Sequence, residues 1–285
     1  MASFDSTASQ LFDLTGKTAL VTGGSRGIGR GLAIGMARQG ADIAIVYRSA
    51  MKEADEVTRE IENCGRRAWS YRKDLARTED LGELAEEIWR QTGKIDILVN
   101  NAGIAYSERF NEITSERWRK VMAVNVDAVF FLTRCIAERM IAFGIKGRII
   151  NISSANGFCA EAGHSHYNSS KGALESLTQT LAIELGEHGI TANTVCPGII
   201  ETEIIGEIAL TSEYLDYFKQ HVPLEHRLGT VEECVGAVVL FASRAGSYIT
   251  GQHIIIDGGV MCEQVPRLPY MPPYRNTIKA AEQDR

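Results

Sequence analysis

The sequence lacks the marks of a membrane, secreted or metal-binding protein. No apolar run approaches the roughly 18 to 20 residues that a membrane-spanning helix needs, and no basic segment followed by an apolar stretch opens the chain. Six cysteines occur singly, without a CxxC pair, and the histidines show no metal-ligand spacing. We therefore expect reduced thiols in a cytoplasmic protein with no metal and no membrane partner.

A large excess of charge of either sign is also missing. The 285 residues carry a formal net charge of -6 and 45% hydrophobic residues. A mildly acidic balance argues against nucleic acid as the main partner. The apolar content suffices for one large core, near the upper size of about 250 to 300 residues for a single domain.

Proline is scarce except at the C-terminal end of the chain. Residues 263–285 hold four of the six prolines, namely Pro266, Pro269, Pro272 and Pro273. Such a stretch favours extended structure and cannot add a central strand. Two interpretations stay open: a loosely attached tail, or an arm that crosses to a neighbouring subunit with Tyr270 and Tyr274 as anchors.

Short runs rich in Val and Ile alternate with longer amphipathic stretches that close at Gly65 and Gly93, where left-handed caps are expected. Strands without clean alternation are typical of a parallel sheet that is buried on both faces. The pattern predicts an α/β fold: a Rossmann-type, doubly wound parallel sheet of about seven strands in a single domain over residues 1–262. The expected strands are Thr18–Thr22, Asp42–Tyr47, Arg67–Tyr71, Ile95–Asn100, Gly147–Ser153, Ile190–Val195 and His253–Asp257.

A glycine-rich segment, TGGSRGIG from Thr22 to Gly29, joins the first expected strand to a helical pattern. Glycines let backbone N–H groups and a helix N-terminus approach a pyrophosphate, because no Cβ stands in the way. Gly23, Gly27 and Gly29 are spaced G-x-x-x-G-x-G rather than in the commoner G-x-G-x-x-G. A tight turn alone could explain three glycines, but their place between a strand and a helix favours dinucleotide binding.

The end of the second expected strand bears on which dinucleotide is bound. An acidic residue there would hydrogen-bond the ribose hydroxyls of NAD and repel a 2′-phosphate. Instead the strand ends in VYRSA, with Arg48 at that position and Arg26 inside the glycine segment. A guanidinium suits a phosphate, so we expect NADP(H) rather than NAD(H). If both arginines are merely solvated, either cofactor fits.

The stretch HSHYNSSKGALESL places Tyr167 and Lys171 four residues apart, which is one face of a helix. A free tyrosine, with a pKa near ~10, is a poor base at neutral pH. An ammonium one turn away favours the phenolate and should lower that pKa, which would make the phenol useful as an acid and as a base. The pattern alone is common by chance and fits a surface helix. Ser153 and Ser154, expected at the carboxyl edge of the fifth strand, strengthen the catalytic interpretation.

Together these motifs resemble the short-chain dehydrogenase/reductase family over about residues 12–262. The resemblance implies that Tyr167 is the general acid/base and that Lys171 tunes it and anchors the cofactor ribose. It gives the catalytic serine as Ser154, at the usual interval before the tyrosine, and leaves Ser153 structural. It also implies that Asn125, in VMAVNV, holds a water in a proton relay to the lysine.

The same resemblance implies the cofactor contacts. In the family, the DL pair meets adenine, NNAG lies beside the adenosine ribose, PGIIET meets the nicotinamide carboxamide, and ITGQHIIIDGG is a closing strand at a subunit interface. The cofactor-binding residues are then Gly23, Ser25, Arg26, Gly27, Ile28, Gly29, Arg48, Ser49, Asp74, Leu75, Asn101, Ala102, Gly103, Tyr167, Lys171, Pro197, Gly198, Ile200 and Thr202.

The substrate pocket is less sharply defined by the sequence. A mobile lid is expected at about residues 203–227, where this family carries one. Asn156 and His164 could hydrogen-bond the hydroxyls of a sugar or sugar acid, although His164 could equally be a solvated loop residue. Positions expected to face the pocket are Ile104, Tyr106, Asn156, Phe158 and His164.

The opening LFDLTGKTALVTGGSRGIG resembles the sugar-acid and aldose dehydrogenases of the family, such as gluconate dehydrogenases, and also its 3-oxoacyl-carrier-protein reductases. We expect an NADP(H)-dependent enzyme that interconverts a secondary alcohol or hemiacetal and a carbonyl on a sugar or sugar-acid substrate. The resemblance implies a homotetramer or homodimer. A 3-oxoacyl-carrier-protein reductase or another carbonyl reductase is the alternative. A catalytically silent NADPH-binding regulator is more remote, because such relatives usually lose the tyrosine or the lysine.

Overall fold

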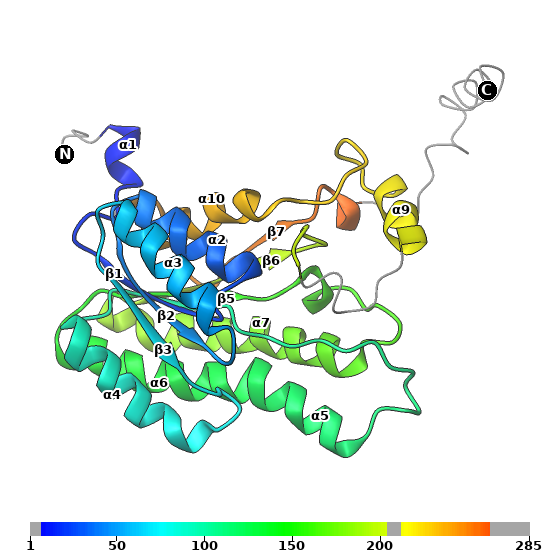
Figure 1. Cartoon of the computed structure of the whole chain (residues 1–285), viewed down its shortest axis with the longest axis horizontal. Helices are drawn as coiled ribbons and strands as arrows, with labels where there is room; N and C mark the ends of the chain where they lie inside the picture. Colours follow the sequence, from blue (N-terminus) through cyan, green and yellow to red (C-terminus); the bar gives the residue numbers. More distant parts are fainter. Residues whose placement is uncertain (1–6, 204–211, 263–285) are drawn as a thin grey trace.

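A computed structural model describes residues 7–203 and 212–262, which form one parallel sheet between two layers of helices (Figure 1). The seven strands are ordered β3-β2-β1-β4-β5-β6-β7, and every neighbouring pair is parallel. The predicted doubly wound sheet is therefore confirmed. The strands are β1 Thr18–Thr22, β2 Asp42–Tyr47, β3 Ala68–Arg72, β4 Ile97–Asn100, β5 Arg148–Ile152, β6 Thr191–Pro197 and β7 His253–Ile256.

The strand boundaries match the prediction for β1 and β2 and differ by one or two residues elsewhere. β6 runs on to Pro197 rather than ending at Val195, because β7 still pairs with it there, Pro197 opposite Ile256. Where a strand ends depends on how far its neighbour continues the ladder of hydrogen bonds, and a single strand's sequence does not contain that information.

Three helices, α2, α3 and α10, cover one face of the sheet, while α4, α6 and α7 cover the other (Figure 1). The left-handed caps expected after α3 and α4 are present, with φ of +73° at Gly65 and +80° at Gly93. The α-helices are α1 Ala8–Leu11, α2 Gly27–Arg38, α3 Met51–Asn63, α4 Leu81–Thr92, α5 Ser115–Met122, α6 Ala128–Ala142, α7 Ser165–Leu185, α9 Ser212–Gln220 and α10 Val231–Ala242.

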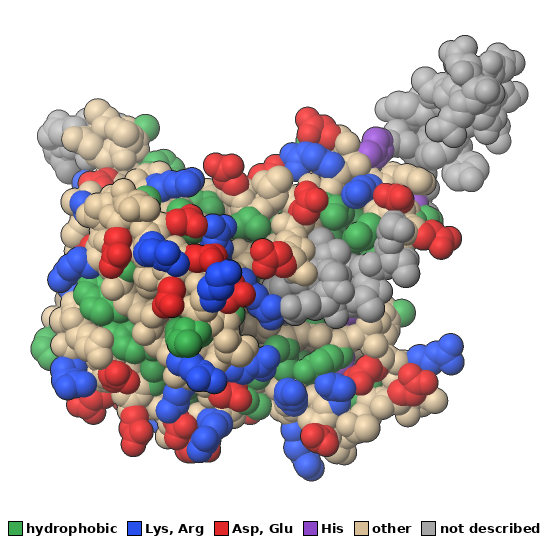
Figure 2. All heavy atoms as spheres, in the orientation of Figure 1, with side chains coloured by type: hydrophobic (Ala, Val, Ile, Leu, Met, Phe, Trp, Pro, Cys, Tyr) green, Lys and Arg blue, Asp and Glu red, His purple; other side chains and the backbone are tan. Residues whose placement is uncertain are grey.

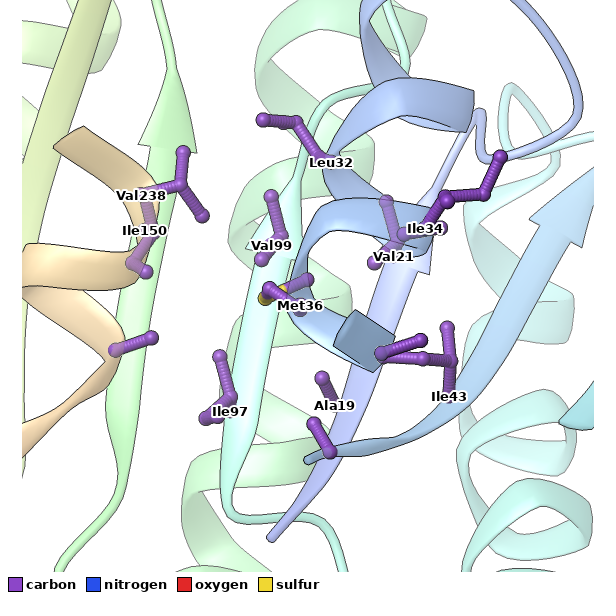
Figure 3. Close-up of a cluster of buried hydrophobic side chains, with 14 of the residues drawn as sticks. Ala19, Val21, Leu32, Ile34, Met36, Ile43, Ile97, Val99, Ile150 and Val238 are labelled. Carbon is purple, nitrogen blue, oxygen red and sulfur yellow. The ribbon is translucent and has the colours of Figure 1, made fainter. Parts of the chain in front are cut away.

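The core consists of two apolar layers, one on each face of the sheet. Figure 3 shows the layer under α2, where Val21, Val99 and Ile150 from the strands meet Leu32 and Met36 of the helix. The other layer packs the alternate strand residues, such as Leu20 and Leu98, against α4, α6 and α7. Each fully buried side chain of this size contributes about 1.5 to 3 kcal/mol. This two-sided burial explains why the strand sequences do not alternate.

Acidic and basic side chains are intermixed over the face of the molecule seen in Figure 2. All six cysteines are free. Among the described residues, no helix is both long and apolar enough to cross a membrane, and no group of three ligand side chains could hold a metal. The proline-rich tail and residues 204–211 of the expected lid lie outside the described residues.

Candidate active site

The glycine loop lies at the carboxyl end of β1 and leads into α2. Gly23 and Gly27 adopt φ of +65° and +53°, a region that favours glycine. A Cβ at Gly29 would overlap the main-chain oxygen of Gly23 and the side chain of Asn101, so the loop closes only with glycine there. The loop therefore presents backbone N–H groups and a helix N-terminus at the sheet edge, as a pyrophosphate requires.

Two side chains fix this loop, one from the end of β1 and one from the segment after the neighbouring strand β4. Asn101 Nδ2 donates to the main-chain oxygens of Thr22, at 2.9 Å, and of Gly23, at 3.2 Å. Thr22 Oγ1 in turn accepts from the N–H groups of Asn101 and Ala102, both at 3.0 Å. The NNAG segment thus positions the glycine loop. The side chain of Asn101, which the sequence assigned to the cofactor, is engaged in holding this loop.

Cations gather where the adenosine end of a dinucleotide would lie. Arg48 is exposed just beyond β2, and Arg26 precedes the first turn of α2. Arg72, at the end of β3, pairs in register with Tyr47 and donates from Nε to the main-chain oxygen of Arg48 at 3.2 Å. Sequence reasoning missed Arg72. The signal was available, because parallel strands that end together bring their last residues to one edge.

The other expected cofactor positions follow the carboxyl ends of the strands along the same edge. Asp74 closes a turn by accepting from the N–H of Ala76 at 3.1 Å, and Leu75 beside it is buried. Gly198 donates to the main-chain oxygen of Ile256 at 2.8 Å, which ties the loop after β6 to β7. Ser25, Ile28, Ser49, Gly103, Pro197, Ile200 and Thr202 are also among the described residues of these loops.

Tyr167 and Lys171 lie in the first turns of α7, beside the glycine loop's edge of the sheet. The ammonium Nζ of Lys171 lies 5.5 Å from the centre of the Tyr167 ring and donates to the main-chain oxygen of Ile152 at 2.9 Å. A Cβ built on Gly103 would lie 3.7 Å from that Nζ. Ser154 is buried, and its hydroxyl acts on the phenol of Tyr167 by lowering the pKa of that phenol. The expected serine, tyrosine and lysine therefore converge.

The pKa of Tyr167 is raised, whereas the sequence predicted that it is lowered. Burial raises it above the ordinary value, the hydrogen bond from Ser154 acts in the opposite direction, and the charge of Glu161 raises it further. The expectation that the phenol has a lowered pKa is wrong, because burial raises the pKa by more than the interaction with Ser154 lowers it. Burial also lowers the pKa of Lys171 to about 8. At neutral pH the phenol is therefore protonated and suited to donate a proton.

Asn125 occupies a π-helical turn, Ala123–Asp127, between α5 and α6. Its Oδ1 accepts from the N–H of Ile104 at 2.9 Å, while Nδ2 donates to the oxygen of Ile104 at 2.9 Å and to Ser170 Oγ at 3.0 Å. The side chain joins the loop after β4 to α7, and both of its N–H groups are hydrogen-bonded. π-Turns of this kind are frequent at functional sites. The relay role expected for Asn125 stays a prediction.

The substrate side is built from the loop between β5 and α7. The main-chain N–H of Asn156 donates to Ser154 Oγ at 3.1 Å, and its side-chain Nδ2 donates to Glu161 Oε2 at 3.2 Å. His164 is buried, with Nδ1 3.2 Å from the oxygen of Ala162, so the alternative of a solvated loop histidine is wrong. Glu161 also accepts from the hydroxyl of Tyr214 in α9, at 2.8 Å. Sequence reasoning missed Glu161.

A second missed group holds the start of α7. His166 is fully buried; its Nδ1 accepts from the N–H of Tyr167 at 2.8 Å, and its Nε2 faces Glu108 Oε2 at 3.3 Å. Arg117 pairs with Glu108 at 3.2 Å and stacks over the ring of Tyr106 at 3.9 Å. Tyr106 is therefore covered by a guanidinium. His166 satisfies one of the free N–H groups at the helix start and so helps to position Tyr167.

Comparison with known proteins identifies the family of this chain. A family model described as enoyl-(acyl carrier protein) reductase matches residues 23–261. A gluconate 5-dehydrogenase of Gluconobacter oxydans (strain 621H) is 38% identical over 250 residues, which cover 88% of this chain and 96% of that protein. An L-rhamnose 1-dehydrogenase (NADP(+)) of Thermoplasma acidophilum is 38% identical over 251 residues, or 88% of this chain and 98% of that one.

Solved structures show the same fold. A gluconate 5-dehydrogenase from Burkholderia cenocepacia J2315, in complex with NADP and tartrate, superposes with a TM-score of 0.85 at 35% identity, covering 90% of this chain and 100% of that one. Residues 23–261, which the family model matches, include Ser154, Tyr167 and Lys171. The chain therefore belongs to the short-chain dehydrogenase/reductase family, as the order of its motifs predicted.

Proposed function

We propose that this protein is an NADP(H)-dependent oxidoreductase that interconverts a secondary alcohol or hemiacetal and a carbonyl on a sugar-type substrate. One observation carries the proposal: Nζ of Lys171 lies 5.5 Å from the centre of the Tyr167 ring, and the hydroxyl of the buried Ser154 acts on the phenol by lowering its pKa. A glycine loop shaped for a dinucleotide lies at the same edge of the sheet. Relatives named as gluconate and rhamnose dehydrogenases support the sugar-type substrate.

The residues at the nucleotide end fit NADP(H). The backbone of the glycine loop would hold the pyrophosphate, and Arg48 and Arg72 would face a 2′-phosphate, together with Arg26. No carboxylate follows β2 to repel that phosphate, since the strand runs into Arg48, Ser49 and Ala50. The NADP in a related structure and the NADP(+) in a relative's name point the same way. When bound, this cofactor supplies or accepts the hydride.

The protein's own residues handle the proton and the substrate oxygen. In reduction, Ser154 Oγ hydrogen-bonds the carbonyl oxygen, and the protonated Tyr167 donates its proton to that oxygen as negative charge develops there. The Lys171 ammonium, held on the oxygen of Ile152, stabilises the phenolate that remains. Oxidation reverses each step, with the phenolate as base. General acid/base groups of this kind contribute about 10²- to 10⁴-fold to the rate.

The assembly and the lid are further parts of the proposal. Family resemblance supports a homotetramer or homodimer and a cytoplasmic location. The expected lid, about residues 203–227, includes α9, and the hydrogen bond from Tyr214 to Glu161 gives it a contact on the substrate side.

A 3-oxoacyl-carrier-protein reductase is the second candidate, since relatives named 3-oxoacyl-[acyl-carrier-protein] reductase are 34% and 37% identical to this chain. The polar side chains beside Ser154, namely Asn156, Glu161 and His164, favour a hydroxylated substrate over an acyl chain.

Initial rates with NADP(H) and NAD(H) against neutral sugars, polyols, sugar acids and β-keto thioesters test the proposal. We expect turnover of polyhydroxylated compounds, with NADP(H) preferred. Turnover of β-keto thioesters alone would favour the acyl-carrier reductase. Binding of NADPH without oxidation by any carbonyl would favour the regulator.

A further inference from the structure

We infer that Glu161 is a specificity-determining residue: its carboxylate restricts this site to neutral polyhydroxylated substrates and excludes sugar acids. The inference rests on the proposed function and narrows its substrate class from sugars and sugar acids to neutral sugars and polyols.

The Glu161 carboxylate is held in place from several elements. Oε2 accepts from Asn156 Nδ2 at 3.2 Å, and Oε1 accepts from the hydroxyl of Tyr214, on α9, at 2.8 Å. The main-chain oxygen of Glu161 accepts from Asn168 Nδ2, on α7, at 2.9 Å. The carboxylate is thus oriented between the β5–α7 loop and α9.

This carboxylate is close to the reacting groups. Asn156 links it to the catalytic serine, because the main-chain N–H of Asn156 donates to Ser154 Oγ at 3.1 Å while its side chain donates to Glu161. The charge of Glu161 also reaches the phenol, whose pKa it helps to raise. A substrate whose oxygen is held by Ser154 and Tyr167 would therefore lie near Glu161.

No strong cation offsets the charge. Within residues 7–203 and 212–262, the one ionisable nitrogen found within 4.0 Å of the carboxylate is Nδ1 of His164, at 3.9 Å. That nitrogen already faces the oxygen of Ala162 at 3.2 Å. Lys171, the nearest catalytic cation, is buried and held on Ile152. A carboxylate substrate would therefore meet a like charge at Glu161.

The same group can bind hydroxyls. An ionised carboxylate has about four lone-pair positions, and the side chains of Asn156 and Tyr214 use two of them. The remaining positions accept from substrate O–H groups, and hydrogen bonds to a charged acceptor are stronger than those between neutral groups. Glu161 would then favour neutral sugars in two ways: its carboxylate attracts substrate hydroxyls and repels substrate carboxylates.

The test compares kcat/KM for an aldose and for the aldonic acid of the same carbon skeleton, with NADP+, in the wild type and in Glu161→Gln. We expect the wild type to prefer the neutral sugar by about tenfold or more, and Glu161→Gln to reduce that ratio by about tenfold, partly by raising the rate with the acid. Glu62→Gln, at an exposed position of α3, makes the same change in net charge and should leave the ratio unchanged.

Glu161→Asp distinguishes the effect of the negative charge from the effect of side-chain length. It keeps the negative charge and shortens the side chain, so it should retain the exclusion of the acid while raising KM for the neutral sugar. It also provides the test if Glu161→Gln does not fold.

Two results would overturn the inference: a wild type that uses the acid as well as the sugar, or a ratio that changes equally in Glu161→Gln and Glu62→Gln. Failure of the proposed function looks different, because the wild type would then turn over neither compound with NADP+.

Discussion

The two ends of the active site are built in different ways. At the nucleotide end, the expected binding surface is formed by the backbone. Gly23, Gly27 and Gly29 lie within one loop, and Asn101 fixes that loop by donating to main-chain oxygens. At the substrate end, the expected binding surface is formed by side chains. The hydrogen-bonded pair Glu161 and Tyr214 comes from segments 53 residues apart in the sequence. A site for one shared cofactor can use a fixed backbone shape, whereas a substrate site varies through loop side chains on a rigid scaffold.

Tyr167 lies between these two ends, and its removal should have the largest effect. Tyr167→Phe keeps the ring and deletes the proton donor, so we expect turnover to fall by about 10²-fold or more, with little change in NADPH affinity. Steady-state rates and NADPH titration by fluorescence measure the two quantities. Full activity in this variant would remove Tyr167 from its assigned role.

NADPH binding at the nucleotide end should weaken when the backbone conformation of the glycine loop is disturbed. In Gly29→Ala the new Cβ would overlap the oxygen of Gly23, and we expect NADPH affinity to weaken by about tenfold or more. Gly236→Ala, in α10, is the control, because a Cβ there has nothing within 4 Å. Equal NADPH affinity in both variants would show that the loop does not carry the cofactor.

The choice between the two dinucleotides is expected to depend on charge at the same end. Arg48→Asp places a carboxylate where a 2′-phosphate would lie, so the ratio of kcat/KM for NADP+ to that for NAD+ should fall by about tenfold. Arg90→Asp, on the exposed surface of α4, carries the same change of charge and should not alter the ratio. A wild type that already prefers NAD+ would show that the residues after β2 do not select NADP+.

The pH dependence of the reaction rate should show the smallest of these effects. Oxidation needs the phenolate of Tyr167, whose pKa is raised, so its rate should increase from neutral toward alkaline pH, while reduction uses the phenol and is active at neutral pH. Glu161→Gln removes one cause of the raised pKa and should shift the alkaline limb of oxidation to lower pH. The other groups near the phenol, Ser154, His164 and Lys171, are unchanged in that variant.

That shift is read against Glu62→Gln, which should have the wild-type profile. Identical limbs in Glu161→Gln and the wild type would mean that the carboxylate does not act on the phenol.

The fold was predictable because its signals are local. Runs such as Ile43–Val46 in β2, followed by an amphipathic helix closed by Gly65, indicate a parallel sheet without any knowledge of neighbours. Strand ends were less accurate, since Pro197 remains in β6 only because Ile256 pairs with it. The glycine loop and the Tyr167–Lys171 spacing are local patterns of the same kind.

The substrate end was not predictable in the same way. Glu161 belongs to no local pattern, and its partner Tyr214 is identified only by the folded chain. The pKa of Tyr167 was mispredicted for a related reason: the spacing to Lys171 is visible in the sequence, but the burial that opposes it is produced by the surrounding loops. Arg72 reaches Arg48 only through the register of β2 and β3.

Transfer of deuterium from NADPH labelled at C4 of the nicotinamide, to a neutral keto-sugar or aldose, tests the central claim most directly. We predict that the wild type delivers the label to the carbon that bears the new hydroxyl, and that Tyr167→Phe binds the labelled NADPH but delivers almost none. NADPH oxidation without label in the alcohol product, or equal transfer by both proteins, would contradict the account.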